Sequence, residues 1–204
     1  MKKAITLSVL LIFSILSFAQ VRLEGLVKPG TKLIYAVEAG EQKYNFIVTV
    51  KTLLPVVTFD WEMTDPISNN GTITHTAAAM MAANTMYNRF SPGSKTLDDN
   101  SLSVWLSKNS HAGLTKGNKW IMISMNTGDA PKKMGANMDD LKELKITVNG
   151  EKETVEEAIA KVLNEEGRPV GDEDFFTFYN SSKLPIILRM KIDFYIVLKE
   201  IKTK

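Results

Sequence analysis

The sequence predicts an α+β protein dominated by one antiparallel, strongly curved sheet or half-barrel, with two or three short helices packed on it. The main observation is an alternating stretch near the C-terminus, where every even position from Leu184 to Leu198 is apolar. A period of two residues is typical of a strand with one covered face. The stretch exceeds the usual strand length, so we expect one long bent strand or two strands joined by a bulge.

Two neighbouring strands are predicted in the first third of the chain. Apolar residues alternate with polar ones from Tyr44 to Val50 and again from Val57 to Met63, and only a short link around Pro55 separates the two runs. Residues 31–37 and 72–76 are expected to add strands on either side. Residues 146–150 are predicted to form a short strand that enters a tight turn.

Helical patterns are fewer. Residues 155–166 are predicted to form a helix, because a capping box at 154–157 precedes an apolar stripe and Gly167 follows as a stop. A second helix is expected over residues 77–88, with Met80, Met86 and Tyr87 on its apolar side, and a third over residues 107–114. Residues 127–140 are predicted to form a mobile loop.

The N-terminus has the layout of a secretory signal. Lys2 and Lys3 precede an apolar run that ends at Ser17-Phe18-Ala19, so residues 1–19 are expected to be cleaved after Ala19. The run is shorter than the roughly 20 residues of a spanning helix, which argues against a membrane anchor. Residues 20–204 then form a single β-rich domain, placed in the periplasm or released outside the cell.

Composition excludes several kinds of function. The chain has 25 Lys and Arg against 23 Asp and Glu, and the signal carries two of the lysines, so the remaining domain has no net charge. Such a domain has no electrostatic reason to bind nucleic acid or an anionic membrane, and we expect a monomer. The absence of cysteine from the sequence excludes disulfides, thiolate metal sites and a lipid anchor on cysteine.

Several short motifs together resemble a known family. They follow the signal in this order: Gly30-Thr31-Lys32-Leu33-Ile34-Tyr35, Gly71-Thr72-Ile73-Thr74, the Ala/Met helix, Leu97-Asp98-Asp99-Asn100, Val104-Trp105-Leu106-Ser107-Lys108 and Leu184-Pro185-Ile186-Ile187. The chain resembles a family of exported proteins of unknown function from Bacteroidetes-type Gram-negative bacteria. The resemblance implies an open, curved antiparallel sheet and an exported protein. Its motifs are structural, so it implies no active site.

No catalytic or metal-binding motif stands out. His75 and His111 lack a hydrolase motif around Ser107, Ser110 or the acids at 98–99, so surface or capping positions are expected for both. The acidic clusters at 98–99, 139–140 and 172–174 are expected to be solvated loop residues, with weak divalent-cation binding at 172–174 as the alternative. The ten methionines are expected to be core residues rather than copper ligands. We therefore expect no enzyme, no cofactor and no metal.

The surplus of apolar strand faces suggests a binding function. Too few helices are predicted to cover the curved sheet, so a groove that holds a lipid-like ligand or an apolar segment of an envelope protein is the leading hypothesis. Its lining would come from Met80, Met86, Tyr87, Phe59, Trp61, Met190 and Phe194. The alternative is an interaction or structural module without a cavity, which docks an envelope partner through a sheet edge or through the loop at residues 127–140.

Overall fold

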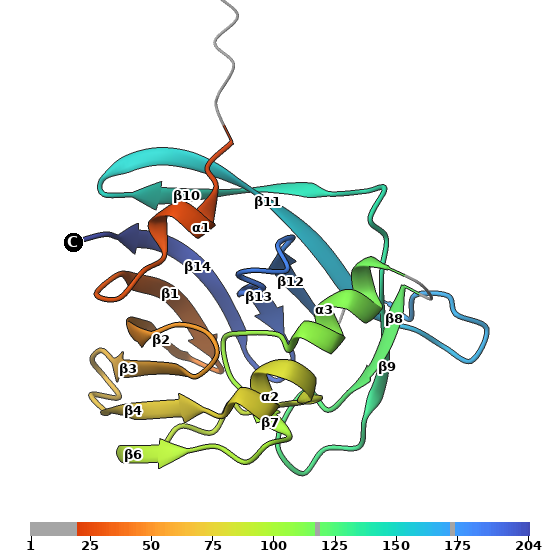
Figure 1. Cartoon of the computed structure of the whole chain (residues 1–204), viewed down its shortest axis with the longest axis horizontal. Coiled ribbons are helices and arrows are strands. Elements are labelled where there is room, and N and C mark those ends of the chain that lie inside the picture. Colours follow the sequence, from red (N-terminus) through yellow and green to blue (C-terminus); the bar gives the residue numbers. More distant parts are fainter. Residues whose placement is uncertain (1–19, 117–118, 172–173) are drawn as a thin grey trace, which may run out of the picture.

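The computed structural model describes residues 20–116, 119–171 and 174–204, so the predicted signal at residues 1–19 lies outside the described residues. The described part is mostly β, with one 12-stranded sheet, a two-stranded sheet and three short helices (Figure 1). The main sheet is strongly curved and largely antiparallel. The predicted fold class is confirmed at this level, and the sheet is more closed than predicted.

The first part of the sheet is an antiparallel meander. Its strands are β1 (Lys32–Ala39), β2 (Gln42–Thr52), β3 (Val57–Met63) and β4 (Asn70–His75), and the parallel strand β6 (Gly93–Thr96) forms the edge. Buried side chains alternate with partly exposed ones along β1, β2 and β3, as the period of two predicted. One face of the meander is therefore covered by the rest of the molecule.

The second part of the sheet closes into a ring. Its strands are β8 (Trp120–Ile123), β9 (Lys132–Ala136), β10 (Lys142–Val148), β11 (Glu151–Val162), β12 (Phe175–Tyr179), β13 (Ile187–Lys191) and β14 (Tyr195–Lys202). Neighbouring strands from β10 to β14 pair antiparallel, and β10 also pairs parallel with β14 at Thr147–Glu200 and Val148–Ile201. These five strands close on themselves, and β14 also pairs with β1 and so joins the two parts.

The predicted helix at residues 155–166 is wrong, because most of this segment lies in β11. Asn149 and Gly150 have φ values of +51° and +92°, the left-handed conformation of a two-residue hairpin turn, and they direct the chain back along β10.

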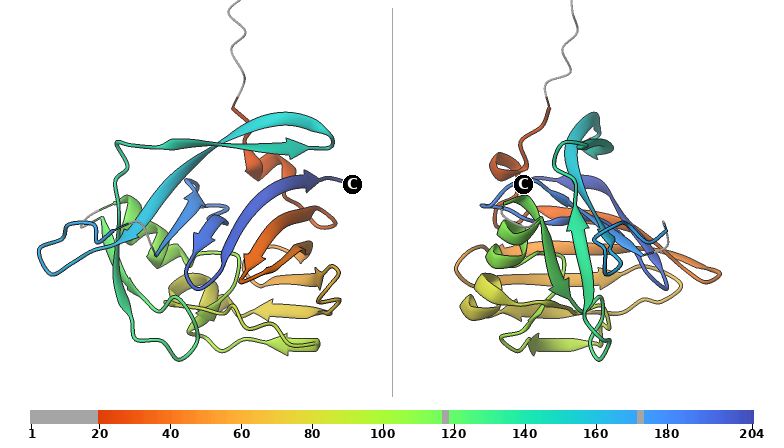
Figure 2. Two further views of the ribbon diagram at one scale, coloured as in Figure 1. Left: turned by 180° about the vertical axis from the view of Figure 1, so that it is seen from behind. Right: turned by 90° about the vertical axis from the view of Figure 1, so that its right-hand side faces the viewer.

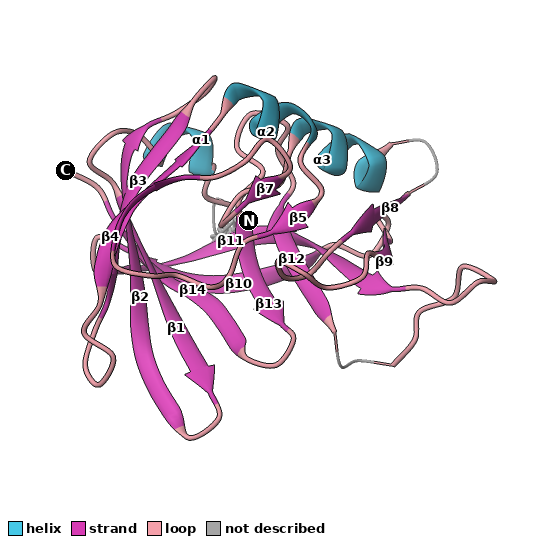
Figure 3. Ribbon diagram, turned by 90° about the horizontal axis from the view of Figure 1, so that it is seen from below, coloured by secondary structure: helices cyan, strands magenta, loops and turns pink. Residues whose placement is uncertain are grey.

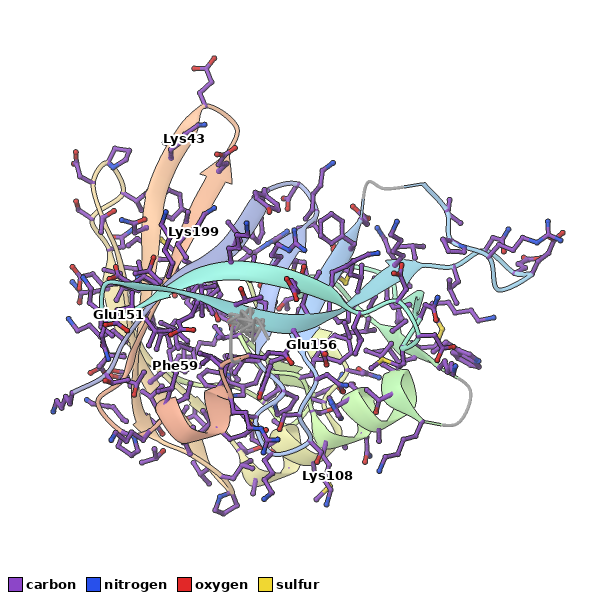
Figure 4. The ribbon with its side chains drawn as sticks, turned by 90° about the horizontal axis from the view of Figure 1, so that it is seen from above. Lys43, Phe59, Lys108, Glu151, Glu156 and Lys199 are labelled. Atoms are coloured by element: carbon purple, nitrogen blue, oxygen red, sulfur yellow. The ribbon has the colours of Figure 1, made fainter. Side chains whose placement is uncertain are left out.

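Along its length β11 also pairs with β12 and β9. Glu157 and Ala158 are both fully buried although they point to opposite faces, so the sequence lacks simple alternation here. Tertiary pairing overrides the local helical pattern. Figure 4 shows the β10–β11 hairpin crossing above the other elements, with Glu151 and Glu156 on β11.

The long C-terminal alternation forms two strands joined by a tight turn rather than by a bulge. In the β13–β14 hairpin Met190 pairs with Ile196, which keeps their side chains on one face across the turn. The even-numbered residues are buried or half-buried, as predicted. A register shift between β12 and β13 opposite Phe178 brings Ile187, an odd-numbered residue, to the interior as well.

The three helices lie on one side of the curved sheet, with α2 and α3 next to each other (Figures 2 and 3). They are α1 (Leu23–Leu26), α2 (Ala77–Ala82) and α3 (Lys108–Thr115). The predicted third helix is confirmed as α3, which Ser107 caps by accepting from the Ser110 N–H. The helix predicted over residues 77–88 ends at residue 82, because the chain then pairs as strand β5 (Thr85–Met86) with β7 (Ser101–Leu102). Within the described residues, no helix has the length and hydropathy needed to cross a membrane.

Candidate functional site: an apolar cavity in the bend of the sheet

An apolar cavity of about 100 Å³ lies where the meander meets the β13–β14 hairpin. One wall comes from the covered face of the meander: Tyr35, Val37, Ala39, Tyr44, Phe46 and Met63. The opposite wall comes from the hairpin: Ile187, Met190, Phe194 and Ile196. Two further segments, residues 86–90 and 103–104, complete the lining of the cavity. They contribute Met86, Asn88, Phe90, Ser103 and Val104. The site thus joins residues from both parts of the fold.

Aromatic rings build the meander wall. Phe46 lies at the centre, with its ring centroid 4.6 Å from that of Phe90 and 6.3 Å from that of Tyr35. Trp61 packs behind Phe90 at 5.2 Å, and Tyr87 meets Phe90 edge-on at 5.6 Å. Aromatic pairs at these distances contribute beyond the area they bury, so this wall is expected to be stiff.

The polar groups at the cavity are few and uncharged. The Tyr35 hydroxyl donates to the Ile187 carbonyl oxygen at 2.9 Å, and burial raises the pKa of Tyr35 well above its usual value. The Asn88 amide donates to the Met125 carbonyl oxygen at 2.8 Å. Of the described residues that line the cavity, none carries a charge at neutral pH. An ionised ligand group would lose its hydration without gaining a counter-ion, which disfavours it strongly.

The volume limits what can enter. A cavity of about 100 Å³ is smaller than the roughly 300–1,000 Å³ of sites that enclose a whole drug-sized ligand. Apolar cavities of order 150 Å³ are known to stay dry and to accept a single small ring. The cavity therefore fits one ring or a short stretch of an alkyl chain, while the remainder of a larger ligand would stay outside.

Three of the seven residues predicted to line a groove do line this cavity: Met86, Met190 and Phe194. Trp61 and Tyr87 belong to the layer behind Phe90. Phe59 packs elsewhere in the core against His75 and Trp105, and Met80 lines a separate surface groove of about 380 Å³ beside α2.

Most of the residues of the meander wall are absent from the lining that the sequence predicts. The alternation in residues 44–50 already placed Tyr44 and Phe46 on one apolar face, so a signal for these two existed. No pattern in the sequence predicts that Asn88 and Ser103 line the cavity. They lie there because each follows one of the two paired strands β5 and β7. Ile187 has an odd number, so it falls outside the apolar alternation of the even-numbered positions.

The expectation that both histidines are surface or capping residues is wrong, because both are buried. His75 Nε2 accepts the Ser103 N–H at 3.1 Å, and burial lowers the pKa of His75 to about 3. Burial, and then the charge of Lys116, lowers the pKa of His111, against the opposing effect of a side-chain hydrogen bond with Asn180. Both are therefore held neutral inside the core.

The serines and acids of the hydrolase alternative form hydrogen bonds with groups other than the histidines. The Ser107 hydroxyl donates to that of Ser110 at 3.0 Å, and the Ser110 hydroxyl donates to the Ala83 carbonyl oxygen. Asp98 accepts the Asn100 N–H, and Asp99 accepts the Thr76 hydroxyl at 2.6 Å. Among the described residues, neither histidine forms a hydrogen bond with a serine hydroxyl or a carboxylate, so these side chains lack the contacts of a catalytic triad.

The acids and methionines take the positions of structural residues. Asp139 and Asp140 pair with neighbouring lysines, and Asp174 pairs with Lys132, while residues 172–173 lie outside the described residues. No cluster of three or more His, Cys, Asp or Glu that could hold a metal occurs in the described ranges. Met122 is exposed and Met125 is buried, so their thioethers lie in different environments.

A buried ion pair links three strands of the ring. Glu157 on β11 is fully buried and pairs with the Arg189 guanidinium on β13, whose Nε donates to Glu157 Oε2 at 2.9 Å. The Thr177 hydroxyl on β12 donates to the same oxygen at 2.7 Å. The carboxylate is thus held by charge-assisted hydrogen bonds, and this cluster stands apart from the cavity.

Comparisons with protein-family models, with curated proteins and with solved structures found no match. The class of protein is therefore defined by the fold and the site themselves. It is a curved, mainly antiparallel β protein that closes into a five-stranded ring at one end and holds a small uncharged cavity in its bend.

Proposed function

We propose that this chain is an exported, non-catalytic binding protein that holds a neutral apolar group in the cavity between the meander and the β13–β14 hairpin. The observation that carries the proposal is the lining: aromatic, aliphatic and thioether side chains surround a space with a few uncharged polar groups. Ligand sites commonly combine such a lining with a few orienting polar groups.

Export is supported by the sequence. The two lysines, the apolar run and the small residues before residue 20 form a secretory signal, and the absence of cysteine from the sequence suits a domain that relies on packing alone. The periplasm is the proposed location, with release outside the cell as the alternative. The family resemblance to exported Bacteroidetes-type proteins belongs to the same proposal.

The ligand proposed is the apolar end of a lipid-like molecule or an apolar side chain of an envelope protein. The small volume admits one ring or a short alkyl segment, so any polar head stays outside the cavity. Asn88 and Ser103 provide uncharged polar groups in the lining of the cavity. A ligand that must place a charge inside is disfavoured.

The neutral dye N-phenyl-1-naphthylamine tests the proposal, because its single phenyl ring can enter the cavity while the naphthyl group stays outside. Its fluorescence should rise on binding to the purified chain without residues 1–19, and Ile196→Trp should abolish most of this rise because the larger ring fills the cavity. Ile47→Trp is the matched control, since Ile47 is half-buried on the opposite face of the sheet. If both variants bind the dye like the parent, or if the parent binds none and no lipid is extracted from the protein purified from its host, the proposal is wrong.

A module that docks an envelope partner without using the cavity is the second candidate function. It is favoured by the edge of the sheet at β8, where two large apolar side chains, Trp120 and Met122, are exposed. The sequence assigned residues 127–140 to a mobile loop, but Lys132–Ala136 form β9 beside this edge. The two candidates use different surfaces, so the cavity variant Ile196→Trp separates them.

A further inference from the structure

We propose that a groove beside α2 binds single molecules of an alkyl carboxylate, with the alkyl chain on its apolar walls and the carboxylate at Lys108. The groove has a volume of about 380 Å³ and lies between the β2–β3 turn, α2, the start of α3 and residues 182–185. Small-molecule sites typically enclose roughly 300–1,000 Å³, so this space is large enough for such a ligand. Among the described residues, the groove and the cavity share no lining residue, so the groove is a second site beyond the proposed function.

The floor of the groove is buried and fixed. Met80, Leu106 and Pro185 form it, and all three are buried. The Leu106 N–H donates to the Pro185 carbonyl oxygen at 2.8 Å, which holds the two segments of the floor together. An alkyl chain in the groove would therefore lie on a continuous apolar surface that exists before binding.

The wall opposite α2 is the turn between β2 and β3, which carries Leu54 and Pro55. The Thr52 hydroxyl donates to the Val56 carbonyl oxygen at 2.8 Å and accepts the Thr58 N–H at 3.0 Å. These two hydrogen bonds hold the base of the turn. A wall that is already ordered lowers the conformational entropy lost on binding.

Exposed apolar side chains concentrate at this groove. Six large hydrophobic side chains are exposed in the described part of the chain, and three of them lie in or beside the groove: Leu54 at 52%, Met81 at 47% and Val56 at 39%. The helix α2 itself, Ala77–Ala82, carries no charged residue. Such a concentration of exposed apolar surface is typical of an interaction site.

Charge selects the head group of the ligand. Lys108 is the one charged residue among the described residues that line the groove, and it lies exposed at the start of α3 (Figure 4). No carboxylate of the described residues forms an ion pair with it. Asp99 accepts the Thr76 hydroxyl at the start of α2 and is not part of the lining. A carboxylate would thus gain a counter-ion here, and the Ser182 hydroxyl in the lining can donate to it.

The test titrates the ¹⁵N-labelled chain without residues 1–19 with decanoate and with decyltrimethylammonium, which has the same chain length and the opposite charge. Both probes are used below the concentrations at which they form micelles. Decanoate is expected to give saturable amide shifts at Leu54, Met81 and Lys108, and the cation should bind about two- to fivefold more weakly. Equal affinity for the two probes, or decanoate shifts that spare these residues, would overturn the proposal.

Two other occupants of the groove would also overturn it. If phosphatidylglycerol vesicles bind the chain in sedimentation while decanoate does not bind, the surface docks on a bilayer. If light scattering shows a dimer that decanoate does not dissociate and that Met81→Gln abolishes, a second copy of the chain covers the groove.

A charge reversal tests the role of Lys108. Lys108→Glu should lower the affinity for decanoate about five- to tenfold and make decyltrimethylammonium the tighter ligand, because attraction and repulsion exchange places. A glutamate at the first position of a helix is favourable, so α3 should stay folded. Lys145→Glu is the matched control, since it makes the same change of charge on β10, which contributes nothing to the groove. Equal effects of the two variants would refute a carboxylate site at Lys108.

A second pair of variants tests the groove itself. Ala77→Trp places a large ring in the groove and should weaken both probes at least about tenfold, whereas Ala78→Trp is the control, because Ala78 is also exposed on α2 but does not line the groove. Circular dichroism checks that both variants fold, and unchanged affinity in folded Ala77→Trp would refute the site. Ile196→Trp, which fills the cavity, should bind decanoate like the parent, and a loss of binding there would move decanoate to the cavity and overturn the proposal.

Discussion

The Glu157–Arg189 pair makes the strongest prediction about stability. Glu157 is fully buried, and the Arg189 side chain is 25% exposed. Arg189→Ala leaves a buried carboxylate with only the Thr177 hydroxyl as a side-chain partner. Removing one partner of a buried pair typically costs about 3–5 kcal/mol, and we expect the lower part of this range because Arg189 reaches solvent. For a domain of this size that loss lowers Tm by roughly 6–15 °C.

Urea unfolding followed by circular dichroism measures this effect. The midpoint should fall in Arg189→Ala with little change in slope, since the same surface is exposed on unfolding. Glu157→Gln in the Arg189→Ala background should recover part of the loss, because the unpaired charge is gone while the hydrogen bond from Thr177 can persist. A loss under about 1 kcal/mol in Arg189→Ala, the range of exposed pairs, would refute the description of this pair as buried.

Three further predictions concern the core, the edge of the meander and the helix caps. Burial lowers the pKa of His75 to about 3, so the unfolded state binds a proton that the folded state does not, and stability should fall by up to about 1.4 kcal/mol per unit as pH drops from 6.5 toward 3; a His75→Gln variant with the same acid slope would contradict this. Gly71→Ala should destabilise by about 1–3 kcal/mol in thermal unfolding, because its Cβ would lie against the Gly93 carbonyl oxygen; an unchanged Tm would contradict it. Thr76→Ala should lose about 1 kcal/mol in urea unfolding, since Thr76 caps α2, whereas Thr154→Ala should lose less because Thr154 lies in β11 and caps no helix.

Short-range patterns in the sequence determined several elements. The strands at residues 44–50 and 57–63 follow from alternation, α3 matches the helix expected over residues 107–114, and the turn after residue 148 follows from Asn149-Gly150. Each depends on contacts or dihedral preferences within a few residues. The local sequence is therefore sufficient to predict such elements.

Only the tertiary structure decided the identity of β11, the closure of the ring and the position of the cavity. Residues 155–162 carry both a helical stripe and strand-compatible residues, and pairing with β10, β12 and β9 selects the strand. The ring closes between Val148 and Ile201, and the cavity joins Tyr35 to Ile187. Contacts between residues so distant in sequence leave no periodic pattern, because their free energy depends on how whole strands pack against one another.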